Sequence, residues 1–571
     1  MTTISHVRGC QPSSMLDYAT SLLASNSTFT DQIHRMDRAV DAAMDKWQGE
    51  AAAAASARSL SESLAASHID TAVIAIAEAH SSHGGVLEGI RTSLLAIVDL
   101  EAPGAGMTVS DDGIVTAPTV PLGSDVVVSM LLQSQLDAQA DALEVRIEAL
   151  LVQFGEGEMQ AAQAIRAAQQ QLDAAGSPGA ATISPAVSDI ISGTTSLPSD
   201  PAQLHQMWST LSPADKDALF AHDNYIGNRD GLPVVDRDHY NRIKLDDELT
   251  RAEACDPTVS NRLIDLQAVR DTIEKDPNRM LMLLDTQSGA QTHAAVAVGN
   301  PDTADHMSVT TPGLNTTVGG AIGAMTQEGE QMKSTAEAQL DRTAGHQGET
   351  VSTIAWIGYD APQLDKDDYF SEESIAGAIQ VAQPWNAQAA APDLSQFYKG
   401  IDASNYDDDP HLTAVGHSYG SFTTGLALQE TPEGIVDDVM VYGSPGLGTG
   451  HDFDSSLDKL NIAPGHAYEM TAHNDPVAHM NRFGWSPGYM SEFTHLDTDA
   501  TTTADGVVRQ GASGHSEYPR SGDNGELRTS GYNTAVVIAG LAGVPGVLVT
   551  GDSAIQTGGI DLLNQLTELG R

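Results

Sequence analysis

The 571-residue chain is poor in basic residues and cysteines, and each shortage excludes a class of site or partner. Only 28 Lys and Arg stand against 77 Asp and Glu, which gives a formal net charge of −49. Nucleic acids and anionic membrane surfaces are bound through clusters of Lys and Arg, so we expect neither as a partner. The two cysteines, Cys10 and Cys255, match no metal-binding or redox spacing, and no His-Glu-x-x-His motif occurs. The sequence therefore predicts no metal and no cofactor.

The sequence also lacks a secretory signal peptide and a long uninterrupted apolar run. Its first residues contain no basic stretch followed by an apolar core. The most apolar late segment, 534–551, is interrupted by glycines and a proline, which is typical of a packed helix and its exit. We therefore expect no transmembrane segment. Two locations stay open: the cytoplasm, or export without a signal peptide.

Residues 1–175 are rich in Ala, Ser, Gln and Glu, with few aromatic side chains, a composition typical of long amphipathic helices. We predict three such helices, at about 13–45, 49–100 and 126–173. A small hairpin around Asp112-Gly113 is predicted in the turn-rich segment between the last two. Residues 1–175 thus form a predicted helical domain, and the Gly/Ser/Pro/Thr-rich segment 176–202 is predicted to be a linker.

The pattern changes at about residue 203, where a mostly helical lead-in occupies 203–278. Short apolar and β-branched runs then alternate with helical segments. The predicted strands are 280–285, 293–299, 306–313, 351–360, 411–417, 437–446 and 466–475. The predicted helices are 318–345, 372–403, 418–430 and 528–542. This alternation indicates a mostly parallel sheet with helices on both faces, so residues 279–571 are predicted to form an α/β domain.

One pentapeptide in this domain has the pattern of a nucleophilic serine. Gly416-His417-Ser418-Tyr419-Gly420 follows a strand-like run and precedes a helical one. A serine hydroxyl is unreactive until a base takes its proton, and flanking glycines avoid clashes at a sharp strand-to-helix turn. We therefore predict that Ser418 is a nucleophile and that Gly416, His417 and Gly420 form its turn.

A serine nucleophile needs a histidine base and an acid that orients it, and with this turn both follow the serine in the chain. Asp475 ends an apolar strand and His515 stands in a loop ahead of the last helix, so we predict them as acid and base. Glu517 and Tyr518, which follow His515 closely in the chain, are predicted to support its loop. Other downstream residues stay open as alternatives: His473, His479, His495, Asp497 and Asp499.

Two backbone N–H groups are needed to stabilise the oxyanion that forms during attack by the serine. One is predicted to come from Tyr419, the residue after the nucleophile. The other should come from the loop after strand 306–313. Pro312 has no N–H, which leaves Gly313 or Leu314 as the donor.

Several separated motifs carry a resemblance to a known family. They are AVAVGNPDTADHMSVTTPG, IAWIGYDAPQ, AVGHSYGSFTTGLAL, VYGSPGLG, TAHNDPV and SGHSEY. In this order they resemble the uncharacterised α/β-hydrolase domain family common in actinobacteria, over roughly residues 203–545. The resemblance implies an α/β-hydrolase fold with Ser418, Asp475 and His515 in the nucleophile, acid and base positions. It implies a reaction type but no particular substrate.

The helical region carries a second resemblance. Trp47-Gln48-Gly49 stands between two predicted long helices, which is similar to the WxG hairpin of type VII secretion substrates. The glycine permits a tight turn between helices, and the tryptophan can pack across it. The resemblance implies a protein partner for the helical domain and export without a signal peptide.

The sequence as a whole predicts a serine hydrolase that cleaves small-molecule or lipid carboxylic esters through an acyl-enzyme. The alternative is a non-catalytic interaction or secretion-associated protein, which uses the helical domain and carries a degenerate hydrolase fold. A fluorophosphonate probe separates the two, because it reacts only with an activated serine.

Overall fold

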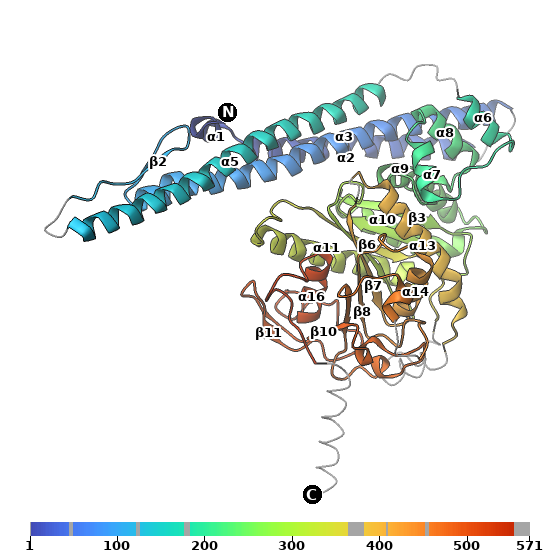
Figure 1. The fold of residues 1–571 in the computed structure, drawn as a ribbon. Helices are drawn as coiled ribbons and strands as arrows, with labels where there is room; N and C mark the ends of the chain where they lie inside the picture. The colour runs from blue at the N-terminus through green and yellow to red at the C-terminus, as the bar shows by residue number, and fades with distance from the viewer. Residues whose placement is uncertain are drawn as a thin grey trace, which may run out of the picture. The chain divides into compact units, whose positions relative to one another are not determined.

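The structure is a computed structural model of the chain (Figure 1). It describes residues 2–552 apart from 45–49, 122–125, 176–182, 364–381, 407–408 and 452–455. The chain divides into two compact units, Met1–Ala181 and Thr182–Arg571. The predicted Trp47-Gln48-Gly49 turn lies outside the described residues.

The first unit is made mainly of long helices. These are α1 (Ile4–Gly9), α2 (Ser13–Met44), α3 (Glu50–Ala96), which continues through the π-helical turn Ile97–Glu101 into α4 (Ala102–Gly104), and α5 (Val126–Ala175). The short strands β1 (Thr108–Val109) and β2 (Val115–Thr116) pair antiparallel around Gly113, which has a φ of 97°. The three predicted long helices and the predicted hairpin are thereby confirmed. A buried apolar cluster joins α1, α3 and α5 through Val7, Leu94 and Phe154.

The second unit is built around a sheet with eight strands among the described residues, in the order β10-β9-β8-β7-β5-β6-β4-β3. The strands are β3 (Arg279–Asp285), β4 (His293–Val298), β5 (His306–Thr311), β6 (Val351–Ile357), β7 (His411–His417), β8 (Asp438–Tyr442), β9 (Ala467–Met470) and β10 (Thr494–Leu496). Strand β4 is antiparallel to β3 and β6, and the other neighbours are parallel. A separate ribbon pairs β11 (Thr501–Thr502) with β12 (Val508–Arg509). The predicted mostly parallel sheet is confirmed.

Helices precede the sheet and connect its strands. They are α6 (Pro185–Ile191), α7 (Pro201–Trp208), α8 (Pro213–His222), α9 (Val234–Glu253), α10 (Leu263–Ile273), α11 (Val318–Arg342), α13 (Trp385–Ser404), α14 (Tyr419–Glu430), α15 (Ser456–Leu460) and α16 (Thr529–Ile538). Helix α6 lies within the segment 176–202 that the sequence predicts as a linker. It begins there because the Ser184 side chain accepts a hydrogen bond from the Val187 N–H and Pro185 occupies the first turn. Among the described residues, none of the helices combines the length and the apolar composition that a bilayer-spanning segment requires.

Different helices cover the two faces of the sheet (Figure 1). Successive side chains of a strand point to opposite faces. In β8, Val439 and Val441 join a core with α13 and α14, whereas Met440 and Tyr442 join a core with α16. Helices α10 and α11 cover the latter face near β4 and β6.

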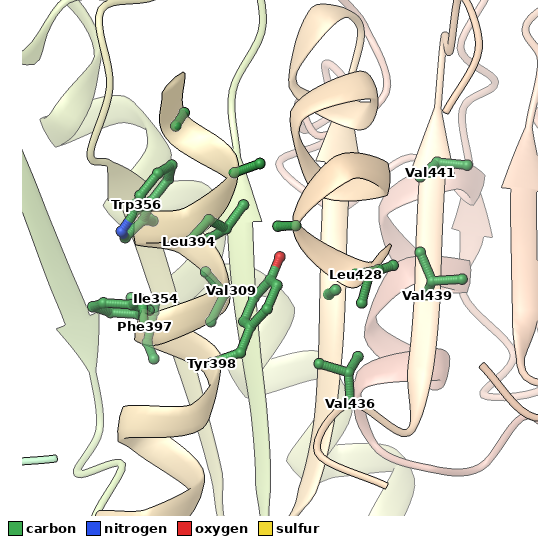
Figure 2. Close-up of a cluster of buried hydrophobic side chains, with 14 of the residues drawn as sticks. Val309, Ile354, Trp356, Leu394, Phe397, Tyr398, Leu428, Val436, Val439 and Val441 are labelled. Atoms are coloured by element: carbon green, nitrogen blue, oxygen red, sulfur yellow. The ribbon is translucent and has the colours of Figure 1, made fainter. Parts of the chain in front are cut away.

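Figure 2 shows the core beneath α13 and α14. Leu394, Phe397 and Tyr398 project from α13 toward the sheet, and Leu428 projects from α14. All four are almost completely buried. This packing holds α14, and therefore the turn at its start, rigidly against the strands.

Candidate active site

Ser418 occupies a sharp turn between the end of β7 and the start of α14. Its backbone has φ 55° and ψ −128°, a conformation that residues other than glycine rarely adopt. Gly416 and Gly420 are required because other backbone atoms lie where their side chains would be. A Cβ on Gly420 would lie 2.3 Å from the Thr311 carbonyl oxygen, and one on Gly416 would lie 2.6 Å from the Ser421 Cα. The turn therefore holds Ser418 in a strained backbone conformation.

Ser418, His515 and Asp475 form a continuous hydrogen-bonded chain. The His515 Nε2 lies 2.8 Å from the Ser418 Oγ, and the His515 Nδ1 lies 2.9 Å from both Asp475 carboxylate oxygens. Since the carboxylate faces Nδ1, that nitrogen carries the proton and donates it, which leaves Nε2 to accept the serine O–H. Ser418 and His515 are only 2% and 3% exposed, so their electrostatic interactions are stronger than they would be in water.

The Asp475 carboxylate has two further donors. The Tyr518 O–H donates a hydrogen bond at 2.6 Å, and the Val477 N–H donates one at 2.9 Å. Burial alone would raise the pKa of Asp475, but the hydrogen bonds from His515, Tyr518 and Val477 outweigh it and hold that pKa below its usual value. Asp475 therefore stays ionised and orients the imidazole.

Tyr518 and Gly443 have roles at this site that the sequence did not reveal. Tyr518 was predicted only to support its loop, yet its hydroxyl contacts Asp475 and also accepts the Ala472 N–H at 2.8 Å. Gly443 follows β8 with a φ of 57°, and a Cβ there would lie 2.7 Å from an Asp475 oxygen and 2.9 Å from the His515 Nδ1. In the sequence, only the position of a glycine after a strand-like run indicated that other atoms come close to the backbone there.

His417, beside the serine, holds the backbone of His515. Its Nε2–H donates to the His515 carbonyl oxygen at 2.9 Å, and its ring stacks on Tyr442 at 5.0 Å between centroids. Burial, together with the nearby His515, lowers the pKa of His417 to about 3. His417 is therefore a neutral residue at pH 7 that positions the loop carrying His515.

Two segments predicted to stabilise an oxyanion lie beside Ser418. Tyr419 is the first residue of α14, so its N–H has no carbonyl of a preceding helical turn to bond with. Gly313 lies directly against the serine: a Cβ on Gly313 would be 2.7 Å from the Ser418 Cβ and 3.0 Å from the His417 carbonyl oxygen.

The loop that contains Gly313 and Leu314 is held from both sides. The Tyr359 O–H donates to the Pro312 carbonyl oxygen at 2.7 Å. On the other side, the Asn315 N–H donates to the Pro362 carbonyl oxygen at 2.9 Å. These two bonds fix the position of the loop beside Ser418.

The alternative residues make other contacts. His473 is exposed. His479 lies 2.9 Å from the Tyr489 hydroxyl, and His495, in edge strand β10, lies 2.6 Å from Glu469. Asp497 accepts the Asp499 N–H at 2.9 Å. Glu517 accepts the Ser513 N–H at 2.8 Å and so supports the loop of His515, as predicted.

Comparisons with known proteins agree with the architecture. A family model described as "Alpha/beta hydrolase" matches residues 288–485, a range that includes Ser418 and Asp475 but ends before His515. An uncharacterized protein of Mycobacterium tuberculosis is 38% identical over 247 residues, which are 42% of this chain and 85% of that protein. An uncharacterized protein of Mycobacterium bovis matches to the same extent. A second M. tuberculosis protein is 26% identical over 310 residues, which cover 48% of this chain and 43% of its own length. The predicted fold class is thereby confirmed.

Proposed function

Because the chain belongs to the alpha/beta hydrolase family, we propose that it is a serine hydrolase that cleaves carboxylic esters. Ser418 is the nucleophile, His515 the base and Asp475 the acid. The observation that carries the proposal is the chain of hydrogen bonds from Asp475 through His515 to Ser418, with Ser418 on a strained turn. Strain of this kind persists where surrounding structure enforces it, and it clusters at active sites.

In the acylation step, the Ser418 Oγ attacks the ester carbonyl carbon and its proton passes to the His515 Nε2. The tetrahedral intermediate carries its negative charge on the former carbonyl oxygen. The N–H of Tyr419 and that of Gly313 or Leu314 stabilise this charge. Collapse of the intermediate breaks the bond to the alkoxy group, which leaves as an alcohol with the proton from His515.

In the deacylation step, water attacks the acyl-Ser418 ester while His515 takes its proton. The second tetrahedral intermediate then releases the carboxylic acid and returns the proton to the Ser418 oxygen. Asp475 stays ionised throughout and stabilises the imidazolium that forms in both steps. Tyr518 and His417 act on the reaction through Asp475 and His515, as positioning residues.

The apolar cluster that includes Phe422 of α14 supports a substrate with an apolar acyl group. Helix α14 carries Phe422, which stacks on Phe483 at 4.1 Å between ring centroids, and Leu314 of the loop beside Ser418 packs on the same cluster. The net charge of −49 disfavours the approach of highly anionic substrates, although Arg482 is a cation close to this cluster, with its guanidinium carbon 5.0 Å from the Phe483 ring centroid. Neutral esters satisfy both conditions.

The test is labelling with a fluorophosphonate probe, alongside hydrolysis of p-nitrophenyl esters of graded chain length. We expect the parent protein to be labelled and to hydrolyse esters, and Ser418→Ala to do neither. The control Ser334→Ala, at an exposed serine of α11, should retain labelling and hydrolysis. His515→Ala should lose nearly as much rate as Ser418→Ala, because triad members act as a unit. His495→Ala is its matched control and should keep the parent rate. Labelling that persists in Ser418→Ala would refute the assignment.

A further inference from the structure

Three metal-binding side chains converge in the first unit, outside the proposed hydrolase site. His6 and Cys10 come from α1 and the residue after it, and Glu158 comes from α5. The His6 Nε2 lies 2.9 Å from the nearer Glu158 carboxylate oxygen, and the Cys10 Sγ lies 3.7 Å from each of those two atoms. Imidazole, thiolate and carboxylate are the three ligand types that proteins use for zinc.

The spacing of the three ligand atoms matches one face of a tetrahedral zinc site. Zinc binds sulfur at about 2.3 Å and nitrogen or oxygen at about 2.0 Å, so tetrahedral angles put sulfur about 3.5 Å from the other two ligands. The same geometry puts nitrogen and oxygen about 3.3 Å apart. The observed 3.7, 3.7 and 2.9 Å differ from these values by at most about 0.4 Å. We propose that His6, Cys10 and Glu158 bind one zinc ion, with water as the fourth ligand.

The chain holds these ligands in place before any ion binds. His6 and Cys10 are one helical turn apart, and the Cys10 N–H donates to the His6 carbonyl oxygen at 3.1 Å. Helix α1 is anchored by Val7 in the apolar core. It lies close to α5 because Gly155 has no side chain: a Cβ there would be 2.5 Å from the Thr2 Oγ1. A backbone fixed in this way lowers the conformational entropy that is lost when the side chains bind an ion.

The charges also fit a divalent cation. A bound Cys10 thiolate and the Glu158 carboxylate together carry two negative charges, which one zinc ion neutralises. Without a metal, burial and the neighbouring carboxylate raise the pKa of the Cys10 thiol, and the Arg91 guanidinium acts on it in the opposite direction. Zinc binding must therefore displace the thiol proton into solvent. A thiolate ligand favours zinc over magnesium or calcium, which prefer sets of oxygen ligands.

The side chains of His6 and Glu158 are 49% and 36% exposed, which leaves room for entry of the ion and for a water ligand. A bound ion would tie α1 to α5 within the first unit. This role does not depend on hydrolase activity, so the two proposals succeed or fail separately.

Cobalt substitution of the full-length protein tests the site directly. We expect reduced, metal-free protein to bind one Co²⁺ tightly, with visible bands typical of four-coordinate cobalt and a near-ultraviolet sulfur-to-cobalt charge-transfer band. Zinc should abolish both signals. Cys10→Ser should remove the charge-transfer band and weaken zinc binding at least tenfold, and His6→Gln should also weaken binding. Cys255→Ser, at the exposed second cysteine, is the matched control and should behave as the parent.

Thiol reactivity gives a second readout that does not rely on spectra. Both cysteines should react with Ellman's reagent in metal-free protein, whereas one equivalent of zinc should protect Cys10 and leave Cys255 reactive. Far-ultraviolet circular dichroism shows whether Cys10→Ser keeps its helices. Three results would each overturn the proposal: no charge-transfer band in the parent, unchanged zinc affinity in a folded Cys10→Ser, or no protection of Cys10.

Discussion

The strained backbone of Ser418 predicts an unusual order of stability among its variants. Ser418→Ala and Ser418→Gly both remove the hydroxyl and its hydrogen bond to His515, so both should be inactive. They differ only in how well they tolerate φ 55° and ψ −128°. Alanine keeps the Cβ that makes this conformation unfavourable, and glycine removes it.

The expected difference can be worked out from two opposing terms. Relief of strain at such a position is worth about 1–3 kcal/mol. Part of this stabilisation is lost, because the greater backbone freedom of glycine in the unfolded chain lowers the free energy of unfolding by about 0.4–1 kcal/mol relative to alanine. Ser418→Gly should therefore be more stable than Ser418→Ala by about 1.3 kcal/mol, the difference between the midpoints of the two ranges, whose extremes give about 0–2.6 kcal/mol. At ordinary positions glycine is the less stable of the two.

Urea unfolding followed by tryptophan fluorescence measures this difference in the second unit, which holds four of the five tryptophans: Trp208, Trp356, Trp385 and Trp485. The matched control is the same pair of substitutions at exposed Ser334 on α11. There glycine should be less stable than alanine by about 0.5–1 kcal/mol. If Ser418→Gly is less stable than Ser418→Ala while the control behaves normally, the backbone of the turn is not strained.

Three further predictions concern groups around the triad. Gly313→Ala places a Cβ 2.7 Å from that of the serine and so must displace the loop; kcat should fall about a hundredfold, whereas Gly543→Ala, with nothing within 4 Å, should leave the rate unchanged. Tyr518→Phe removes a donor to the buried Asp475, worth about 1.5–3 kcal/mol, so kcat/KM should fall about ten- to a hundredfold; a parent-like value would exclude a positioning role. His417 has a pKa of about 3 in the folded protein, below its unfolded value, so the unfolded chain binds the extra proton and the stability due to neutral His417 is lost as pH falls from about 6.5 toward 3. As pH falls over this range, the free energy of unfolding from urea titrations should decrease less steeply for His417→Gln than for the parent. The two slopes should differ by up to about 1.4 kcal/mol per pH unit, and equal slopes would show that His417 is not a buried neutral group.

The fold could be predicted where the signal was local. The run HLTAVGH predicted a strand at 411–417, and β7 spans those residues. The Ala- and Gln-rich composition likewise predicted a helix at 126–173, and α5 spans Val126–Ala175. Helix α6 was missed because its surroundings are rich in Gly, Ser and Pro, and a helix of only seven residues that starts at a cap does not alter that composition. Short helices whose start depends on one capping residue leave only a weak pattern in the sequence.

The contacts between distant residues could not be predicted in this way. The order serine, aspartate, histidine was readable from the chain, but the sequence left several histidines open as the base. Tyr518 and Asp475 are 43 residues apart, and Cys10 and Glu158 are 148 apart. No periodicity links such pairs, because tertiary packing alone brings them together.

Sheet order explains why Gly443 belongs to the same site. Ser418 follows β7 and Asp475 follows β9, and β8 lies between these two strands. Because the three are parallel, their carboxyl ends meet at one edge, and the residue after β8 stands between Ser418 and Asp475. That residue is Gly443, and a Cβ on it would collide with both Asp475 and His515. The aspartate and histidine can therefore reach the serine only because the intervening strand ends without a side chain.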